Sequence, residues 1–193
     1  MSIVTLLSGG LDSCLMSLMI KETNRRQKPL FINYGQLNYE KEFNSAKNHS
    51  EIFELPELTK IDISGFGQVI TSGLTDSNQD IVEDAFLPGR NLLLLLSAAS
   101  FAVKNDCNVI AMGLLNQNTA IFPDQTDDFL FSAEYTIEKA LGKKIEIITP
   151  LRQFYKRDVV ELAKSKNIHT YYSCHKGDDT PCGKCISCKE FDI

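Results

Sequence analysis

Short apolar runs alternate along the chain with longer segments in which apolar residues recur every three or four positions. An apolar run of about four to eight residues suits a buried strand, and the longer spacing suits an amphipathic helix. Strands that alternate with helices are typical of a parallel sheet covered by helices on both faces. The sequence therefore predicts an α/β fold with five strands, at 3–7, 29–33, 58–63, 108–112 and 145–148.

The first two segments between strands, 11–25 and 39–53, each predict a helix with one apolar face. In the second of these helices, Glu42 is expected on the polar face. His49 lies near the edge of the apolar stripe, so we expect a partly solvated surface residue rather than a ligand.

Two later segments have a different character. Residues 90–103 are apolar nearly all round, so this helix is expected to be buried on two sides, by the sheet and by a second subunit. Residues 64–88 lose all periodicity, and such a long loop is usually functional or mobile. We interpret it as part of a substrate lid, with plain disorder as the alternative. Further helices are expected at 129–140 and from about Tyr155 to Ala163.

The turn between the first strand and the first helix reads Ser8-Gly9-Gly10-Leu11-Asp12-Ser13. Glycines let the backbone approach a phosphate closely, and the first amides of a helix carry the positive end of its dipole. The serines add hydroxyl donors, and the carboxylate of Asp12 is a suitable Mg²⁺ ligand. An ordinary strand-to-helix turn is the alternative. The pattern favours a phosphate site, but it is not a Walker A loop, because no Gly-Lys-Ser or Gly-Lys-Thr occurs.

Other candidate site residues stand where strands end and helices begin. The carboxyl ends of parallel strands meet at one crevice, where α/β proteins bind ligands. Side chains there offer donors and acceptors to a polar heterocycle, or a charge to an anion. Polar strand exits and helix caps would explain the same residues without a ligand. The candidates are Tyr34, Gln36, Arg90, Asn91, Gly113, Asp124 and Lys156.

Four of the six cysteines fall within fifteen positions near the end of the chain, with the spacing C-x7-C-x2-C-x2-C. Four thiolates match the tetrahedral coordination of a structural Zn²⁺ ion, although a [4Fe–4S] cluster accepts the same ligands. His175 adjoins the first cysteine and is expected to lie beside the ligands rather than among them. The predicted metal ligands are Cys174, Cys182, Cys185 and Cys188.

Composition narrows the classes of function. The 193 residues carry a net charge of −5, which disfavours nucleic acid as a partner and favours small molecules and proteins. No stretch is apolar over the roughly 20 residues that a membrane span needs, and the N-terminus lacks signal-peptide features. We therefore expect a cytoplasmic protein, in which clustered cysteines bind metal and Cys14 and Cys107 are core residues.

The turn SGGLDS resembles the pyrophosphate loop of the PP-loop ATP pyrophosphatases, which split ATP into AMP and pyrophosphate. In combination with five further features, it makes nearly the whole chain resemble the QueC, or 7-cyano-7-deazaguanine synthase, family. These features are Tyr34-Gly35-Gln36, Pro88-Gly89-Arg90-Asn91, Phe122-Pro123-Asp124, Lys156 and the four-cysteine cluster.

The resemblance implies an adenine-nucleotide α-hydrolase-like sandwich with a five-stranded parallel sheet between helices. Residues 1–170 would form the PP-loop domain, and residues 171–193 a zinc-binding tail packed on it. Members of the family are typically homodimers. The implied enzyme is a ligase that uses ATP and Mg²⁺ to adenylate the carboxylate of 7-carboxy-7-deazaguanine. Ammonia then gives an amide, and a second adenylation leaves the nitrile.

The resemblance also assigns roles to residues. Asp12 and Ser13 would act in catalysis, and Tyr34, Gln36, Asn91 and Asp124 are candidates for contacts to the deazaguanine. From their charge and placement we also expect Arg90 and Lys156 to act in catalysis, by countering developing negative charge. The nucleotide site would comprise Leu7, Ser8, Gly9, Gly10, Leu11, Asp12, Ser13 and Gly113.

The chain departs from the family beside the presumed substrate pocket. Family members usually have Tyr before the Pro-Asp pair and Cys-Arg after it, where this chain has Phe122, Gln125 and Thr126. His175 also replaces an aromatic residue. Adenylation is therefore expected, but the nitrogen acceptor is open: ammonia in biosynthesis, or a protein amine, as in a QueC-like enzyme of anti-phage defence. A non-catalytic nucleotide sensor is a third hypothesis.

Overall fold

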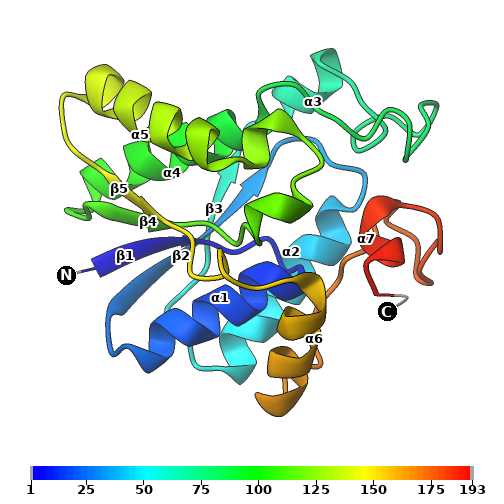
Figure 1. Cartoon of the computed structure of the whole chain (residues 1–193), viewed down its shortest axis with the longest axis horizontal. Helices are drawn as coiled ribbons and strands as arrows, with labels where there is room; N and C mark the ends of the chain where they lie inside the picture. Colours follow the sequence, from blue (N-terminus) through cyan, green and yellow to red (C-terminus); the bar gives the residue numbers. More distant parts are fainter. Residues whose placement is uncertain (1, 192–193) are drawn as a thin grey trace.

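The computed structural model describes residues 2–191 and contains a five-stranded, fully parallel sheet in the order β3-β2-β1-β4-β5 (Figure 1). From β1 the chain continues to β2 and β3 on one side of the sheet and then crosses to β4 and β5 on the other side. A crevice therefore opens at the carboxyl ends of β1 and β4. The predicted α/β fold is confirmed. The strands are β1 (Ser2–Leu6), β2 (Arg26–Asn33), β3 (Thr59–Asp62), β4 (Val109–Ala111) and β5 (Glu146–Ile148).

Helices cover both faces of the sheet (Figure 1). Buried side chains of α1, α2 and α6 share one core cluster, and those of α4 and α5 share the other. The helices are α1 (Leu11–Glu22), α2 (Tyr39–Ile52), α3 (Gly65–Val69), α4 (Arg90–Lys104), α5 (Asp127–Leu141), α6 (Lys156–Ser165) and α7 (Ile186–Lys189).

The central strand β1 joins the two layers because its side chains alternate between them. Ile3 packs in the cluster beneath α1, whereas Val4 and Leu6 pack in the cluster beneath α4. All three are almost completely buried. The end of β1 is thereby held firmly on both sides, which fixes the position of the turn that follows it.

His49 is buried rather than partly solvated, so that expectation is wrong. Its Nε2 lies 2.9 Å from Ser17 Oγ, and that hydroxyl in turn donates to the carbonyl oxygen of Cys14. Because the hydroxyl proton is used, Nε2 carries the ring proton and donates to Ser17. Desolvation lowers the pKa of His49 to about 4, so the ring is neutral. The apolar face of α2 is wider than its sequence pattern indicates, because α2 packs on α1.

The segment 64–88 contains α3, and several of its later side chains are buried. Leu74, Ala85 and Leu87 are each at most 4% exposed, although their spacing matches neither a helix nor a strand. Leu74 and Ala85 also line the cavity described below. Packing of single residues in an irregular loop leaves no periodic signal, and the role of this segment as a lid stays a prediction.

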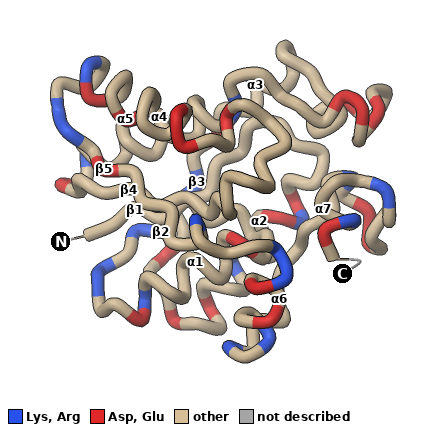
Figure 2. The backbone as a smooth tube through the Cα atoms, viewed as in Figure 1, with Lys and Arg blue, Asp and Glu red and all other residues tan. Residues whose placement is uncertain are grey.

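Within the single chain, the helix α4 buries one face. Leu95, Ala98, Ala99 and Ala102 pack against the sheet, whereas Leu96 is 37% exposed. A second subunit on this helix stays a prediction. Among residues 2–191, no helix combines the length and the apolar composition that a bilayer crossing would require. Figure 2 shows acidic and basic residues interspersed along the helices and loops.

Candidate active site and metal centre

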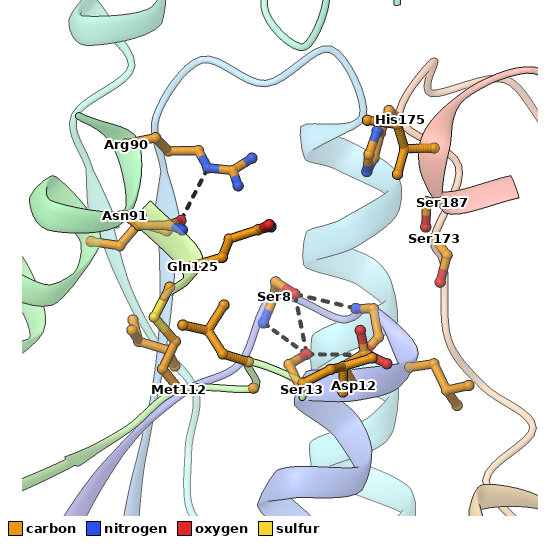
Figure 3. A pocket seen from close by; sticks show the side chains of 18 of the residues that line it. Ser8, Asp12, Ser13, Arg90, Asn91, Met112, Gln125, Ser173, His175 and Ser187 are labelled. Atoms are coloured by element: carbon orange, nitrogen blue, oxygen red, sulfur yellow. Dashed lines mark hydrogen bonds between the residues drawn. The ribbon is translucent and has the colours of Figure 1, made fainter. Parts of the chain in front are cut away.

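The turn after β1 forms a closed network of hydrogen bonds (Figure 3). Ser13 Oγ donates to the carbonyl oxygen of Gly10 at 2.9 Å and accepts from both the amide and the hydroxyl of Ser8 at 3.1 Å. As at every helix start, the first amides of α1 have no acceptor within the helix. Backbone donors and the helix dipole thus converge at the mouth of the crevice, an arrangement that favours a phosphate group.

Gly9 is required at its position for two reasons. Its φ of +84° lies in the left-handed region, and a Cβ atom would stand 2.2 Å from the carbonyl oxygen of Glu42 in α2. Its own carbonyl oxygen accepts hydrogen bonds from Ser45 Oγ at 2.7 Å and from the amide of Tyr172 at 2.9 Å. The loop is therefore clamped between α2 and the C-terminal segment.

Gly113 follows β4 and passes close beneath the same loop. A Cβ atom there would lie 3.3 Å from both the carbonyl carbon of Asp12 and the amide nitrogen of Ser13. The structure thus brings the residues predicted for the nucleotide, 7–13 and Gly113, to one place. Their role in binding stays a prediction.

Lys156, at the first position of α6, forms ion pairs with two carboxylates. Its Nζ lies 2.9 Å from Asp12 Oδ1 and 3.1 Å from Glu190 Oε2, which belongs to the C-terminal tail. Burial favours the neutral amine, but the two negative charges outweigh it and raise the pKa of Lys156 above its ordinary value. The ammonium group is therefore a permanent positive charge beside the phosphate loop.

A cavity of about 320 Å³ opens in front of this loop. That volume lies within the usual range for small-molecule sites. Figure 3 shows Arg90 reaching over the loop from one side and His175 from the other. The walls come from the loop itself, the end of β2, the start of α4, residues 112–125 and the C-terminal tail.

The end of β2 contributes a polar wall. Gln36 Oε1 accepts from the amide of Tyr34 at 2.9 Å, and Gln36 Nε2 donates to Glu42 Oε2 at 3.1 Å. The guanidinium of Arg90 lies over the Tyr34 ring, 5.8 Å from its centroid. Burial raises the pKa of Tyr34, so its phenol keeps its proton. Tyr34, Gln36 and Arg90 all line the cavity.

Asn91 lines the cavity as expected. The side-chain nitrogen of Asn91 donates to the backbone carbonyl of Asp124 at 2.9 Å. Asp124 is 8% exposed, and among the described residues its Oδ1 has no hydrogen-bond partner. Asp124 is not among the residues that line the cavity, and its role as a substrate contact stays a prediction.

Sequence reasoning missed three residues that line the cavity. Glu42 faces it from α2, although its pattern placed it on the polar outer face. Arg152 donates to the carbonyl oxygens of Leu115 and Gln125, which holds the loop after β4 in place. Glu190 arrives from the far end of the chain. Only the charge of Arg152 next to a strand exit offered a local signal.

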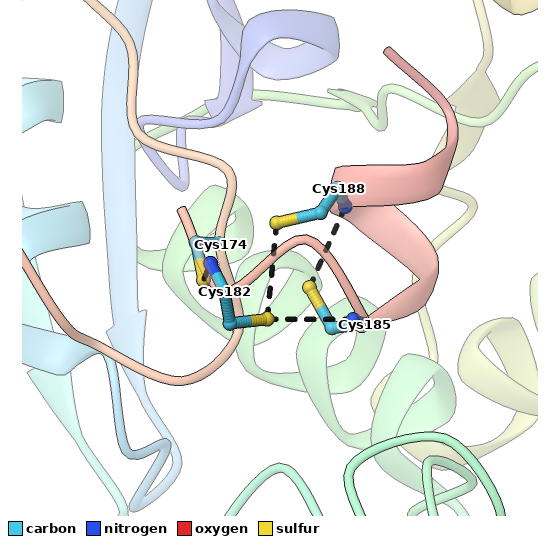
Figure 4. Close-up of side chains that lie close together, drawn as sticks. All are labelled: Cys174, Cys182, Cys185 and Cys188. Atoms are coloured by element: carbon cyan, nitrogen blue, oxygen red, sulfur yellow. Dashed lines mark hydrogen bonds between the residues drawn. The ribbon is translucent and has the colours of Figure 1, made fainter. Parts of the chain in front are cut away.

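The four predicted cysteines lie together in the C-terminal tail (Figure 4). Their sulfur atoms are all within 4.8 Å of one another, and Cys182 Sγ is 3.9 Å from Cys188 Sγ. A tetrahedral zinc ion with bonds of about 2.3 Å requires sulfurs about 3.8 Å apart, so the cluster fits such an ion. Burial opposes ionisation of Cys182, but amide donors including Cys185 lower its pKa to about 6. The cluster could hold a metal ion as thiolates.

The metal cluster and the cavity share the C-terminal tail. Cys174 and His175 are consecutive, yet the histidine ring lines the cavity while the sulfur belongs to the cluster. Asn38 donates to the carbonyl oxygen of Cys174 at 3.1 Å. His175 therefore lies beside the ligands, as expected. The boundary between residues 170 and 171 stays a prediction, because these contacts do not define a domain.

Comparison with known proteins identifies relatives over nearly the whole chain. The family model described as queuosine biosynthesis protein QueC matches residues 2–191. The 7-cyano-7-deazaguanine synthase of Nautilia profundicola is 31% identical over 198 residues, covering 96% of this chain and 89% of that protein. The protein of the same name from Sulfurimonas denitrificans is 32% identical over 200 residues, covering 96% and 88%.

Solved structures with the same fold are more distant in sequence. The U34-tRNA thiolase NcsA from Methanococcus maripaludis, with its [4Fe-4S] cluster, superimposes with a TM-score of 0.57 at 16% identity, covering 92% of this chain and 59% of that one. A 4-thiouridine synthetase in complex with RNA and ATP gives a TM-score of 0.56 at 18% identity, covering 88% and 41%. These likenesses concern the fold alone.

Proposed function

The chain belongs to the QueC family, and on that premise we propose that it adenylates the carboxylate of 7-carboxy-7-deazaguanine and passes the acyl group to a nitrogen nucleophile. It is an ATP-dependent enzyme of the PP-loop type that forms carbon–nitrogen bonds. A carboxylate resists attack until one of its oxygens becomes part of a good leaving group, and AMP is such a group. The chain has to hold two anions together and neutralise their charge.

The phosphate loop is the observation that carries this proposal. The first amides of α1 suit the phosphates of ATP, and the hydrogen bonds between Ser8 and Ser13 hold the loop that presents them. Arg90 and Lys156 supply positive charge to the same cavity. Asp12, now paired with Lys156, has the chemistry to hold Mg²⁺ when ATP binds. The polar wall of Tyr34, Gln36 and Asn91 offers donors and acceptors to the deazaguanine.

The four cysteines fit a structural Zn²⁺ ion best, because all of the donors are thiolates and no ligand position is left open. Metal analysis of the purified protein would show one zinc and no iron if this assignment is right. An absorbance band of an iron–sulfur cluster would contradict it.

The nucleophile is ammonia in the reaction we favour, with a nitrile as the final product. A protein amine is the second candidate, because Gln125 and Thr126 stand where the family usually has Cys and Arg. Gln125 Oε1 accepts from the amides of Ile121 and Phe122, so its oxygen is occupied in shaping the wall of the cavity. A wall changed at this place can alter which amine enters while adenylation is kept.

Substitution of Asp12 by alanine tests the proposal. Pyrophosphate release that depends on 7-carboxy-7-deazaguanine should fall by about 10²–10³-fold, because a charge that organises the phosphates is lost. Asp128→Ala is the matched control, since Asp128 is likewise the second residue of a helix but is exposed.

Mass spectrometry of the products then separates the candidates. A nitrile formed with ammonium chloride supports biosynthesis, and AMP without a small-molecule amide, together with a mass increase on a protein, supports conjugation. Wild-type protein that binds ATP but releases no pyrophosphate with the acid and any amine would leave a sensor and contradict the proposal.

A further inference from the structure

Three carboxyl groups line the cavity among the described residues, and they differ in their partners. Asp12 and Glu190 both form ion pairs with Lys156. Glu42 has no Lys, Arg or His nitrogen within 4.0 Å in the part of the chain that the structure describes. Among these three carboxyl groups, Glu42 is therefore the one whose pKa is not lowered by a salt bridge.

Glu42 lines the same cavity as the phosphate loop. Its Oε2 accepts from Gln36 Nε2 at 3.1 Å, and Gln36 is itself held by the amide of Tyr34. The backbone oxygen of Glu42 abuts Gly9 so closely that no side chain fits between them. A group bound at the phosphate loop would thus share one cavity with this carboxyl.

The surroundings of Glu42 suit proton transfer near neutral pH. Burial raises its pKa to about 7, while the hydrogen bond from Gln36 and the charge of Arg90 act in the opposite direction. The other titratable group on this wall, the phenol of Tyr34, keeps its proton. A carboxyl of this kind is partly ionised at neutral pH, and it holds a proton far better than an exposed one.

The second half of the proposed reaction needs a base. Near neutral pH, ammonia and lysine amines are present almost entirely as ammonium ions, which have no lone pair with which to attack. Proton transfer to a positioned side chain accelerates such a step by about 10²–10⁴-fold. His175 also lines the cavity, but burial, and to a lesser extent the positive charges of Arg90 and Lys156, lowers its pKa to about 4.

We propose that Glu42 is the general base that takes the proton from the attacking nitrogen, which deepens the proposed function and rests on it. The carboxylate accepts one proton from the ammonium ion, and the freed nitrogen lone pair forms the bond to the acyl carbon. The bond from that carbon to the phosphate oxygen of AMP breaks, and AMP leaves with the electron pair. The amide nitrogen releases a further proton to water, so charge and atoms balance.

The test compares Glu42→Gln with the wild-type enzyme in two half-reactions. Glutamine keeps the shape and can still accept from Gln36, but it cannot take a proton. Formation of the adenylate, measured as pyrophosphate released with 7-carboxy-7-deazaguanine, should change by less than about threefold. Amide formation with ammonium chloride near pH 7 should fall by about 10²-fold.

Hydroxylamine is the discriminating nucleophile, because it is largely unprotonated near pH 7 and needs no base to attack. The Glu42→Gln enzyme should form the hydroxamate at a rate within about threefold of wild type, which also proves that the variant is folded. Glu40→Gln is the matched control on the exposed side of the same helix and should be normal in every assay.

Three results would overturn the assignment. Equal losses with ammonium and hydroxylamine would mean that Glu42 positions the acid rather than moves a proton. A large loss of pyrophosphate release would mean that it binds the deazaguanine. Unchanged amide formation would exclude any role. Absence of adenylation in the wild-type enzyme would instead remove the proposed function, and so the two failures are distinguishable.

Discussion

The phosphate loop and the wall that faces it across the cavity are built in opposite ways. The loop is one continuous stretch, 7–13, shaped mainly by short-range hydrogen bonds, and its ties to distant segments include those that Gly9 makes with Ser45 and Tyr172. The facing wall combines Ala85, Arg90, the loop at 114–125 and the tail at 173–190, which are far apart in sequence. The first region needs a motif, whereas the second needs the whole fold.

This difference separates two parts of the function. Binding of phosphates depends on backbone amides and on the helix start, which a short sequence can specify alone. Selection of the acid and the amine depends on how distant segments pack, and single residues there can change without disturbing the loop. The tail connects the two regions, because Tyr172 donates to Gly9 and Glu190 pairs with Lys156.

Removal of the metal should give the largest effect. Cys185→Ser takes one ligand from the cluster, and structural zinc contributes about 10–16 kcal/mol to the folding of small zinc peptides. We expect the bound metal to fall from one equivalent to nearly none and the tail to lose its order. Adenylation should then fall by more than about tenfold, because Gly9 and Lys156 lose their tail contacts. Metal analysis and pyrophosphate release measure both quantities.

Cys107→Ser is the matched control, since Cys107 is a buried cysteine outside the cluster. It should retain the metal and the adenylation rate. If Cys185→Ser lost the metal but kept normal activity at saturating ATP and acid, the tail would not be a functional wall of the cavity. The wall that faces the phosphate loop would then have to be defined without the tail.

His49 joins α2 to α1, the helix that follows the phosphate loop, and it should make the stability of the protein depend on pH. Its pKa is about 4 in the folded protein against an ordinary 6.5, so the unfolded chain binds the proton first. Stability from this residue is complete above pH 6.5 and is lost as the pH falls towards 4, by about 3 kcal/mol in total. Urea unfolding of the wild type between pH 7 and pH 4.5 measures the slope.

His49→Gln isolates this contribution from the release of metal by acid, which affects both proteins alike. The variant should be less stable at pH 7, but its stability should fall less steeply with decreasing pH. Parallel slopes for the two proteins would show that His49 does not anchor α1 to α2 in its neutral form. A dye that reports free zinc, read in the same titration, shows whether the tail is lost first.

The parts of the molecule predicted from the sequence are those with local causes. Apolar residues gave the five strands within a few residues, because each strand, including the largely exposed β3, turns at least one apolar side chain towards a core. Gly9 was found because only glycine permits its left-handed backbone and its close approach to α2. The four cysteines were found because two residues between thiolates suit a single ion.

The parts that were missed depend on packing over long distances. Glu42 has the pattern of a solvated helix residue, and only the turn of α2 against Gly9 brings it to the cavity. Asp124 follows a strand exit like the other candidates, but it does not line the cavity, and its backbone carbonyl accepts a hydrogen bond from Asn91. The burial of His49 was missed because the sequence pattern of a single helix does not show which other helix packs against it.

The smallest effect is expected from the ion pair that joins the tail to the phosphate loop region. Glu190 and Asp12 share the ammonium group of Lys156, and Glu190 also adds negative charge near the place where the phosphates would bind. Glu190→Gln removes that charge, while the metal cluster still holds the tail. A partly exposed ion pair is worth at most about 1 kcal/mol, so the KM for ATP should fall by about two- to fivefold with kcat unchanged.

Two controls test the prediction for Glu190→Gln: the ionic strength and a second ion pair elsewhere in the protein. The decrease in KM should be larger at low ionic strength, because salt screens charges at this distance. Glu22→Gln breaks an ion pair with Lys166 at the far end of α1 and should leave the KM unchanged. If Glu190→Gln instead raised the KM at every salt concentration, the pair would act as a tether, and the tail would contribute position rather than charge to the phosphate site.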